Sequence, residues 1–153
     1  AGANRFGDWR NRILLMADDV DELWERSYFV PSSESLERRA KATSGSYNVE
    51  KIYLDAYRQE TSTGSQSYPE ARRDMFRKIQ RGCLLTNYVG HGGEIGLASE
   101  KLLQLADVTS WTNKDALSLF LTITSLSDRA IFISQVQLTS TTLIRRMTYR
   151  PVF

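Results

Sequence analysis

The segment NYVGHGGE, from Asn87 to Glu94, contains His91, the one histidine of the chain. Because an imidazole titrates near neutral pH, any chemistry here that needs a near-neutral proton acceptor depends on His91. Glycines on both sides let the backbone turn tightly and approach a substrate closely. The N–H of Gly92 could donate to a developing oxyanion. A surface histidine in a glycine turn is the alternative interpretation.

A second candidate, Ser125, follows the apolar segment LSLFLTIT, from Leu117 to Thr124. If this segment and the segment before His91 are neighbouring parallel strands, their carboxyl ends meet at one edge of the sheet. A base at the end of one strand and a nucleophile at the end of the next is the geometry of a catalytic dyad. A serine that begins a loop is the alternative, and the spacing alone favours it.

Two carboxylates, Asp18 and Asp19, come directly after Arg12–Ala17, an apolar segment that is typical of a buried parallel strand. Ligands of open α/β sheets bind beyond the carboxyl ends of such strands. Either carboxylate could orient His91, line a substrate pocket or bind a hard cation. A turn at the end of the strand is the alternative.

Two further residues need an interpretation. Trp111 lies between the candidate base and the candidate nucleophile and could wall a specificity pocket, although packing is the favoured interpretation. Cys83 is a rival nucleophile, but it begins the strand that leads to His91, about 26 Å away along an extended chain. We therefore expect Cys83 to be a small buried side chain.

The elements that position these residues alternate between strand and helix. That order predicts an α/β fold with a mostly parallel sheet and right-handed crossovers. Ala71, Met75 and Ile79 recur every four residues, which predicts one strong helix. We expect strands at 12–17, 47–54, 83–89 and 117–124 and helices at 69–82 and 99–106. Residues 61–67 should form a polar surface loop. Residues 20–43 should be partly helical, with a break at 31–33. Residues 130–138 could form a strand, and the rest of 126–153 stays unassigned.

Composition narrows the possible functions. A formal net charge of +2 is too small to indicate nucleic acid as a partner. A single cysteine excludes an internal disulfide and a multi-cysteine zinc site. The sequence contains no phosphate-binding loop or metal-ligand cluster, so we expect no cofactor and no metal.

Four segments of the chain resemble the gingipain-type cysteine peptidases. They are GDWRNRILLMADD (Gly7–Asp19), YNVEKIYLDAY (Tyr47–Tyr57), LLTNYVGHGGE (Leu84–Glu94) and SWTNKDALSLFLTIT (Ser110–Thr124). More narrowly, they are similar to the sortases of the bacterial type IX (Por) secretion system. The combination of NYVGHGGE and SWTNK is the specific part of the resemblance.

This resemblance implies a caspase-like α/β fold, a mostly parallel sheet flanked by helices, and a Cys–His dyad without a cofactor. His91 matches the family's histidine, Gly92 its oxyanion-hole glycine and Ser125 its nucleophilic cysteine. The acidic member of the site varies in the family. Asp19 is our candidate for orienting His91, and Asp18 and Trp111 are candidates for the substrate pocket.

The resemblance also implies an activity and a set of partners. Such a sortase removes the C-terminal signal domain of secreted cargo at the bacterial cell surface. It can pass the new carboxyl end to an anionic lipopolysaccharide and thereby anchor the cargo to the outer membrane. The expected partners are therefore cargo proteins, lipopolysaccharide and outer-membrane secretion components.

The sequence departs from the family in three ways. Ser125 replaces a cysteine, and a hydroxyl is much less acidic than a thiol, so we expect the chain to be inactive. From Leu126 onward the family pattern does not continue. The chain is also shorter than the family, so we expect 1–153 to be the peptidase core of a longer protein. A non-catalytic cargo-binding or assembly subunit of the same fold is the alternative.

Overall fold

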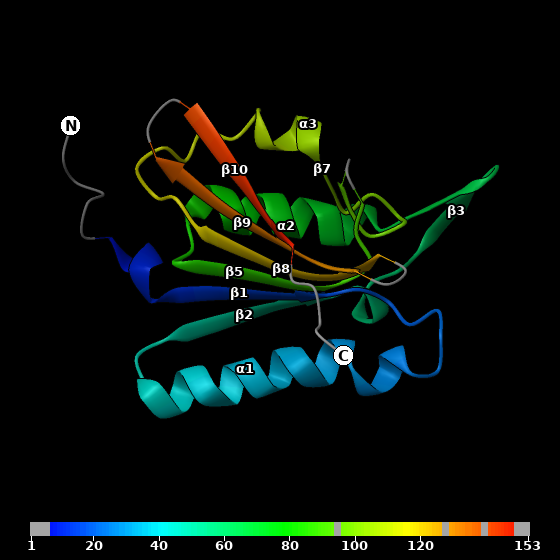
Figure 1. Ribbon diagram of the computed structural model, residues 1–153, viewed down its shortest axis with the longest axis horizontal. Coiled ribbons are helices and arrows are strands. Elements are labelled where there is room, and N and C mark those ends of the chain that lie inside the picture. The colour runs from blue at the N-terminus through cyan, green and yellow to red at the C-terminus, as the bar shows by residue number, and fades with distance from the viewer. Residues whose placement is uncertain (1–6, 94–95, 127–128, 139–140, 149–153) are drawn as a thin grey trace.

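A computed structural model of the chain describes residues 7–93, 96–126, 129–138 and 141–148, without the side chains of residues 105 and 125–148. A six-stranded sheet forms its centre, in the strand order β10-β9-β8-β5-β1-β2 (Figure 1). β2, β1, β5 and β8 run parallel to one another, whereas β9 and β10 are antiparallel to their neighbours. The strands are β1 (Arg12–Ala17), β2 (Asn48–Tyr53), β5 (Leu85–Gly90), β8 (Leu119–Leu126), β9 (Arg129–Leu138) and β10 (Thr141–Thr148).

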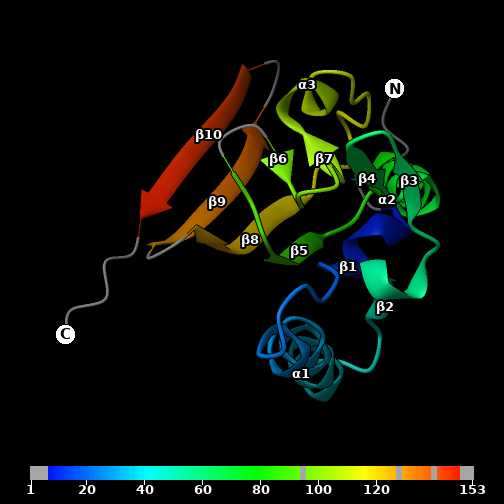
Figure 2. The ribbon, with the colours of Figure 1, turned by 90° about the vertical axis from the view of Figure 1, so that its right-hand side faces the viewer.

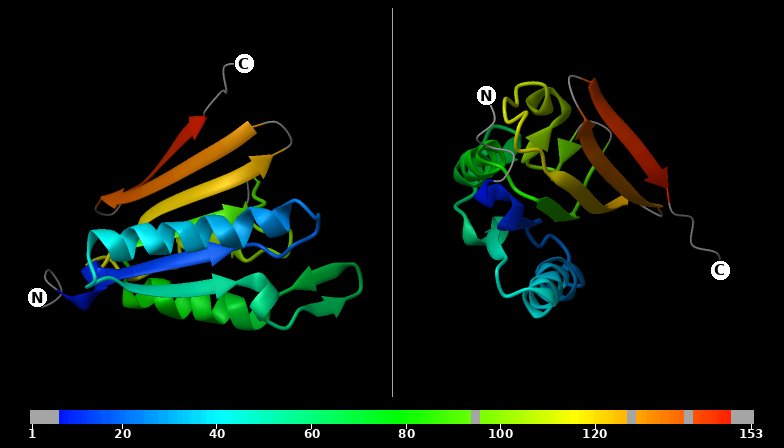
Figure 3. Two further views of the ribbon diagram at one scale, coloured as in Figure 1. Left: turned by 90° about the horizontal axis from the view of Figure 1, so that it is seen from below. Right: turned by 90° about the vertical axis from the view of Figure 1, so that its left-hand side faces the viewer.

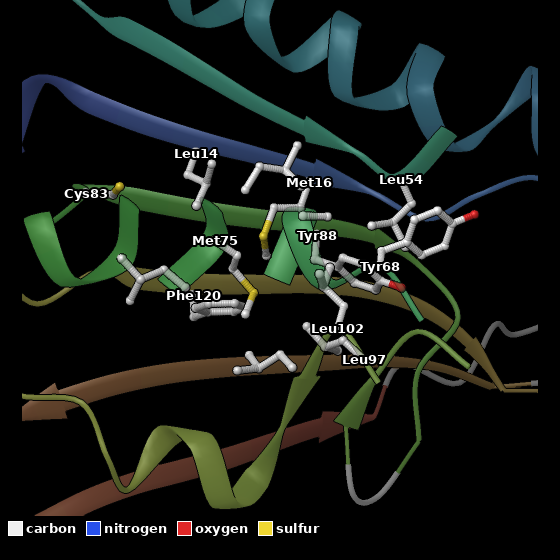
Figure 4. Close-up of a cluster of buried hydrophobic side chains, with 14 of the residues drawn as sticks. Leu14, Met16, Leu54, Tyr68, Met75, Cys83, Tyr88, Leu97, Leu102 and Phe120 are labelled. Carbon is white, nitrogen blue, oxygen red and sulfur yellow. The ribbon is translucent and has the colours of Figure 1, made fainter. Parts of the chain in front are cut away.

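Helices cover both faces of this sheet, as Figure 2 shows: α1 (Phe29–Thr43) lies on one face, and α2 (Pro69–Arg81) and α3 (Leu105–Val108) lie on the other. Strand side chains alternate between the two faces. Leu14 and Met16 of β1 therefore pack in the cluster under α2 (Figure 4), whereas Ala17 packs with Phe29 of α1. The predicted α/β fold with a mostly parallel sheet is confirmed.

The strongest predicted helix, α2, follows its sequence signals closely. Pro69 begins it, where the missing N–H has no intrahelical partner to lose. Ala71, Met75 and Ile79 form its buried face. Gly82 ends it with φ of +91°, a conformation that favours glycine. The buried face of α2 packs in one core cluster with Leu14 and Met16 of β1 and Tyr88 of β5.

Three predictions about local structure were wrong. The expected break at 31–33 is absent, because Pro31 lies in the first turn of α1, where helices tolerate proline. The expected loop at 61–67 is a hairpin of β3 (Glu60–Ser62) and β4 (Ser65–Ser67), turned at Gly64 with φ of +78°. The expected helix at 99–106 is a turn followed by β7 (Leu103–Gln104), which pairs with β6 (Gly96–Leu97), and by the short α3.

The unassigned C-terminal part forms the antiparallel strands β9 and β10, which extend the sheet beyond β8 (Figure 3). The strand suggested at 130–138 is confirmed, and β10 was not foreseen. The described residues also contain three 3₁₀ turns: η1 (Asp8–Asn11), η2 (Glu25–Ser27) and η3 (Leu54–Ala56). Within the described ranges, none of the helices has the length and apolar character that a membrane span requires.

Candidate active site

His91 follows the last residue of β5, and Asp18 follows the last residue of β1. These strands are neighbours, and the N–H of Asp18 donates to the carbonyl of Val89 at 3.0 Å. Gly90 allows the two segments to meet, because a Cβ there would lie 2.3 Å from the Cβ of Asp18. The packing of the two strand ends therefore sets the carboxylate of Asp18 against His91.

The Asp18 carboxylate contacts His91 twice through one oxygen. Oδ2 accepts a hydrogen bond from the His91 backbone N–H at 2.8 Å and lies 3.0 Å from Nδ1 of the ring. Asp18 is 1% exposed, whereas the His91 side chain is 30% exposed. This geometry fixes the ring and favours the tautomer with its proton on Nδ1, the arrangement of a histidine oriented for base catalysis.

A second carboxylate, that of Glu25 in η2, contacts the other side of the ring. Its Oε1 lies 2.8 Å from Nε2 of His91, and the Glu25 side chain is 1% exposed. The Phe29 ring also packs on the imidazole in a T-shaped arrangement, with ring centroids 5.3 Å apart. His91 is thus held between two buried carboxylates.

Glu25 was not among the residues predicted from the sequence. Its Oε2 accepts hydrogen bonds from the N–H groups of Asp21 and Glu22, at 2.8 and 2.7 Å, which folds the side chain back over its own turn. The sequence held no pattern that would have found it, because Glu22, three residues before it, is not the Ser or Thr of a capping box.

Burial and charge act together on the titration of this pair. Burial raises the pKa of Asp18 to about 7, although the hydrogen bond from the His91 N–H opposes the shift. Burial alone would lower the pKa of His91, but the carboxylates of Asp18 and Glu25 outweigh it, and the pKa is raised. The site therefore holds protons more tightly than free side chains would.

A pocket of about 310 Å³ opens beside His91. Two of its residues, Ala98 and Lys101, have φ of 62° and 59°, which is uncommon outside glycine. It is lined by His91, Gly92, Gly93, Gly96, Ala98, Ser99, Lys101 and Gln104. This volume lies at the lower end of the range that small-ligand pockets occupy.

Gly92 sits at the edge of this pocket in a bridge to Leu97. The flanking hydrogen bonds run from Ala98 N–H to the carbonyl of His91 and from Gly93 N–H to the carbonyl of Gly96. In such an antiparallel pair, the N–H of Gly92 points away from β6. This orientation is compatible with the predicted oxyanion donor.

The backbone at Ser125 lies beside the histidine turn. β5 and β8 pair in parallel up to Gly90 and Thr124, so His91 and Ser125 are the next residues on the two chains. β8 continues to Leu126, and Ser125 pairs with Ala130 of β9 instead of beginning a loop. The two predicted members of the dyad therefore follow neighbouring positions on neighbouring strands.

The part of the chain that contains these residues matches a known protein family. The sequence model of peptidase family C25, the gingipain family, matches residues 1–148. The chain belongs to peptidase family C25.

The structural comparison agrees with membership in family C25. The crystal structure of the Arg-specific cysteine proteinase gingipain R matches with a TM-score of 0.52 and 15% sequence identity. The match covers 81% of this chain and 26% of that one, so the chain spans about a quarter of the relative's length. At this identity the likeness shows the fold alone, the caspase-like fold of gingipains. A search of curated proteins gave no match.

In this family C25 chain, the orienting contact belongs to Asp18 and not to Asp19, our candidate from the sequence. Asp19 accepts a hydrogen bond from the hydroxyl of Tyr68 at 2.9 Å. Asp18 is buried and is not among the residues that line the pocket beside His91. Side chains of successive residues point in opposite directions near a strand end, which explains why Asp18 and not Asp19 contacts His91.

Asp18, Asp19 and Glu100 bring carboxylate oxygens within 4.8 Å of one another, and all three residues are buried. Burial raises the pKa of Glu100, and the negative charges of Asp19 and Asp21 act in the same direction. This spacing could hold a cation, but no other feature of the described residues points to one, and we assign no metal here.

Trp111 and Cys83 are core residues. Trp111 stacks on Phe120, with ring centroids 6.2 Å apart, and does not line the pocket beside His91. Its contacts therefore agree with packing, the interpretation favoured from the sequence, and give no support to a wall of this pocket. Cys83 is buried next to α2, and burial raises the pKa of its thiol to about 11. It is unsuited to be a nucleophile.

Gly92 offers a matched test with its neighbour. A Cβ on Gly92 would lie 2.6 Å from Cγ2 of Thr124, whereas a Cβ on Gly93 would meet nothing within 4 Å. We expect Gly92→Ala to lower the free energy of unfolding by about 1–3 kcal/mol through overpacking. Gly93→Ala is the control and should unfold at nearly the parent urea concentration. Equal effects of the two substitutions would contradict this packing.

The raised pKa of Asp18 makes a prediction with a definite sign. The pKa of Asp18 is about 7 in the folded protein and 3.8 ordinarily. Its protonation therefore contributes fully to the stability of the fold below pH 3.8, and this contribution is lost as the pH rises through 7. The raised pKa of His91 acts in the same direction. We therefore expect Asp18→Asn to gain stability relative to the parent between pH 4 and 7. Urea unfolding across this range measures the difference, and a constant or falling difference would be evidence against it.

Proposed function

We propose that this chain is the core of a cysteine endopeptidase and transpeptidase of the type IX secretion sortase kind, with residue 125 in the nucleophile position. The observation that supports it best is the alignment of His91, oriented by Asp18, with Ser125 on the adjacent strand. Its substrate is secreted cargo with a C-terminal signal domain. It acts at the outer membrane, beside other secretion components.

The chemistry needs a thiol at position 125. Nε2 of His91 takes the thiol proton, and the thiolate attacks the scissile carbonyl. The N–H of Gly92 stabilises the oxyanion, and the imidazolium returns the proton to the leaving amine. The acyl-enzyme then passes its acyl group to water or to an amine on anionic lipopolysaccharide, which frees the thiol.

The serine at position 125 prevents the first of these steps, the transfer of the nucleophile's proton to His91. A hydroxyl gives up its proton far less readily than a thiol, and a site arranged for a Cys–His pair does not remove it. The chain as it stands is therefore inactive or nearly so in this proposal.

A second candidate is a non-catalytic cargo-binding subunit of the same fold. Two observations favour it: Ser125 itself, and the carboxylate of Glu25 on the nitrogen that a catalytic base must leave open. Such a subunit would use the pocket beside His91 to hold a cargo peptide without cutting it.

Ser125→Cys is the deciding change. We expect it to create cleavage of a peptide that spans a cargo signal junction, and His91→Ala in the same background to reduce kcat by about 10²–10⁴-fold. Mass spectrometry of the products measures both effects. Ser125→Ala is the matched control and should cleave nothing. A folded Ser125→Cys protein that binds the peptide without cutting it would support the non-catalytic subunit instead.

Acyl transfer is tested separately. We expect the Ser125→Cys protein to form a thioester with a cargo-derived peptide, because the acyl-enzyme precedes both hydrolysis and transfer. Intact mass should show the added acyl group, and an amine nucleophile should remove it as an amide. If the thioester decays to the free acid alone at every amine concentration, the protein is a peptidase and the proposed transpeptidase activity is refuted.

A further inference from the structure

Glu25 is the residue of the site that the proposed chemistry does not use. Its Oε2 is fixed by the N–H groups of Asp21 and Glu22, and its Oε1 lies 2.8 Å from Nε2 of His91. No hydrogen bond from the described residues reaches Oε1, so the ion pair with the imidazole is the contact that compensates its burial. A buried carboxylate held in this way is expensive unless the opposing ring carries a proton.

Both nitrogens of the ring are therefore occupied. Nδ1 is held by Asp18, and Nε2, the nitrogen that must face the nucleophile, is held by Glu25. We propose that Glu25 is a built-in competitor for the nucleophile, a positioning residue whose carboxylate holds Nε2 of His91 until the segment that carries it moves away. This inference rests on the proposed function only for its link to catalysis, since the contact itself is independent of residue 125.

The segment that carries Glu25 is suited to move. Its neighbours Leu23 and Trp24 are 85% and 51% exposed, so it buries little apolar surface of its own. Trp24 contributes an edge contact with Phe29, with centroids 5.8 Å apart, and no described strand pairs with this stretch. Segments with few buried apolar contacts open at low free-energy cost.

Removing the charge of Glu25 should change His91 in a defined direction. The carboxylates that act on the imidazole are Asp18 from the end of β1, Glu25 and Asp21 from the segment after it, and Glu100 from the turn before β7. Glu25→Gln removes one of them and keeps the size of the side chain. With one attractive carboxylate fewer, the remaining carboxylates offset less of the lowering of the His91 pKa by burial, so the ring should release its proton at lower pH than in the parent.

The first experiment uses the chain with Ser125 in place. His91 is the sole histidine, so its imidazole signals in a 15N NMR titration are unambiguous. We expect the titration midpoint of His91 to fall in Glu25→Gln. Glu22→Gln, which removes the same charge from the same segment at an exposed position, should keep the parent midpoint. An unchanged midpoint in Glu25→Gln, or equal shifts in both variants, would overturn the proposal.

The second experiment measures access to Nε2 in the Ser125→Cys background. We expect Glu25→Gln to speed iodoacetamide alkylation of the thiol at position 125 roughly tenfold, the effect of about one pKa unit of competition. The thiol of Cys83 is buried and should stay slow, which reports an intact core. If Cys83 becomes reactive in Glu25→Gln, the core of that variant is disturbed, and Glu25→Asp is used in its place. The aspartate side chain is one methylene shorter, which withdraws the carboxylate from Nε2.

The outcomes separate this inference from the proposed function. A lowered midpoint with faster alkylation supports the competitor, even if no peptide is ever cleaved. A lowered midpoint with unchanged or slower alkylation overturns it, because Glu25 would then set the charge of the ring without obstructing the nucleophile. Cleavage by Ser125→Cys that Glu25→Gln leaves unaltered would also overturn it, while the proposed peptidase stands.

Discussion

The contact between Asp18 and His91 is the constraint on which the rest of the site depends. It exists because β1 and β5 are adjacent and parallel, so that the residues just beyond their carboxyl ends meet. It also requires Gly90, since any Cβ there would displace Asp18. The surrounding core is arranged to hold these strand ends in register. Burial of Asp18 is costly for a carboxylate, and its two contacts with His91 offset that cost.

The sequence predicted those elements whose local pattern and tertiary packing agree. The buried strand β1 and the amphipathic helix α2 are examples, because hydrophobic periodicity alone determines which of their residues enter the core. Prediction failed where the pattern was short or ambiguous. Pro31 was taken for a break although the first turn of a helix accepts proline, and the polar 61–67 hid a hairpin whose strands are only three residues long.

The candidate site was predictable to a similar extent. His91 and Gly92 were predicted because NYVGHGGE occurs together with SWTNK, whereas the glycine-flanked histidine alone left a surface turn open. The choice between Asp18 and Asp19 was not, because a shift of one residue near a strand end reverses the direction of the side chain. Glu25 was beyond reach for a different reason: its contact depends on how η2 folds back over the site, and no spacing along the chain encodes that path.

Asp18 and Glu25 make the same chemical contact with His91 and yet suit opposite roles. The difference lies in the elements that carry them. Asp18 follows a central strand whose displacement would disrupt the core, so releasing Nδ1 would cost more than local opening of a surface segment. Glu25 extends from a short 3₁₀ turn beside exposed side chains, so in our proposal its hold on Nε2 is reversible at modest cost. The proposed base would then lie between a fixed and a movable carboxylate, and its outer nitrogen would be covered or exposed without disturbing the sheet beneath it.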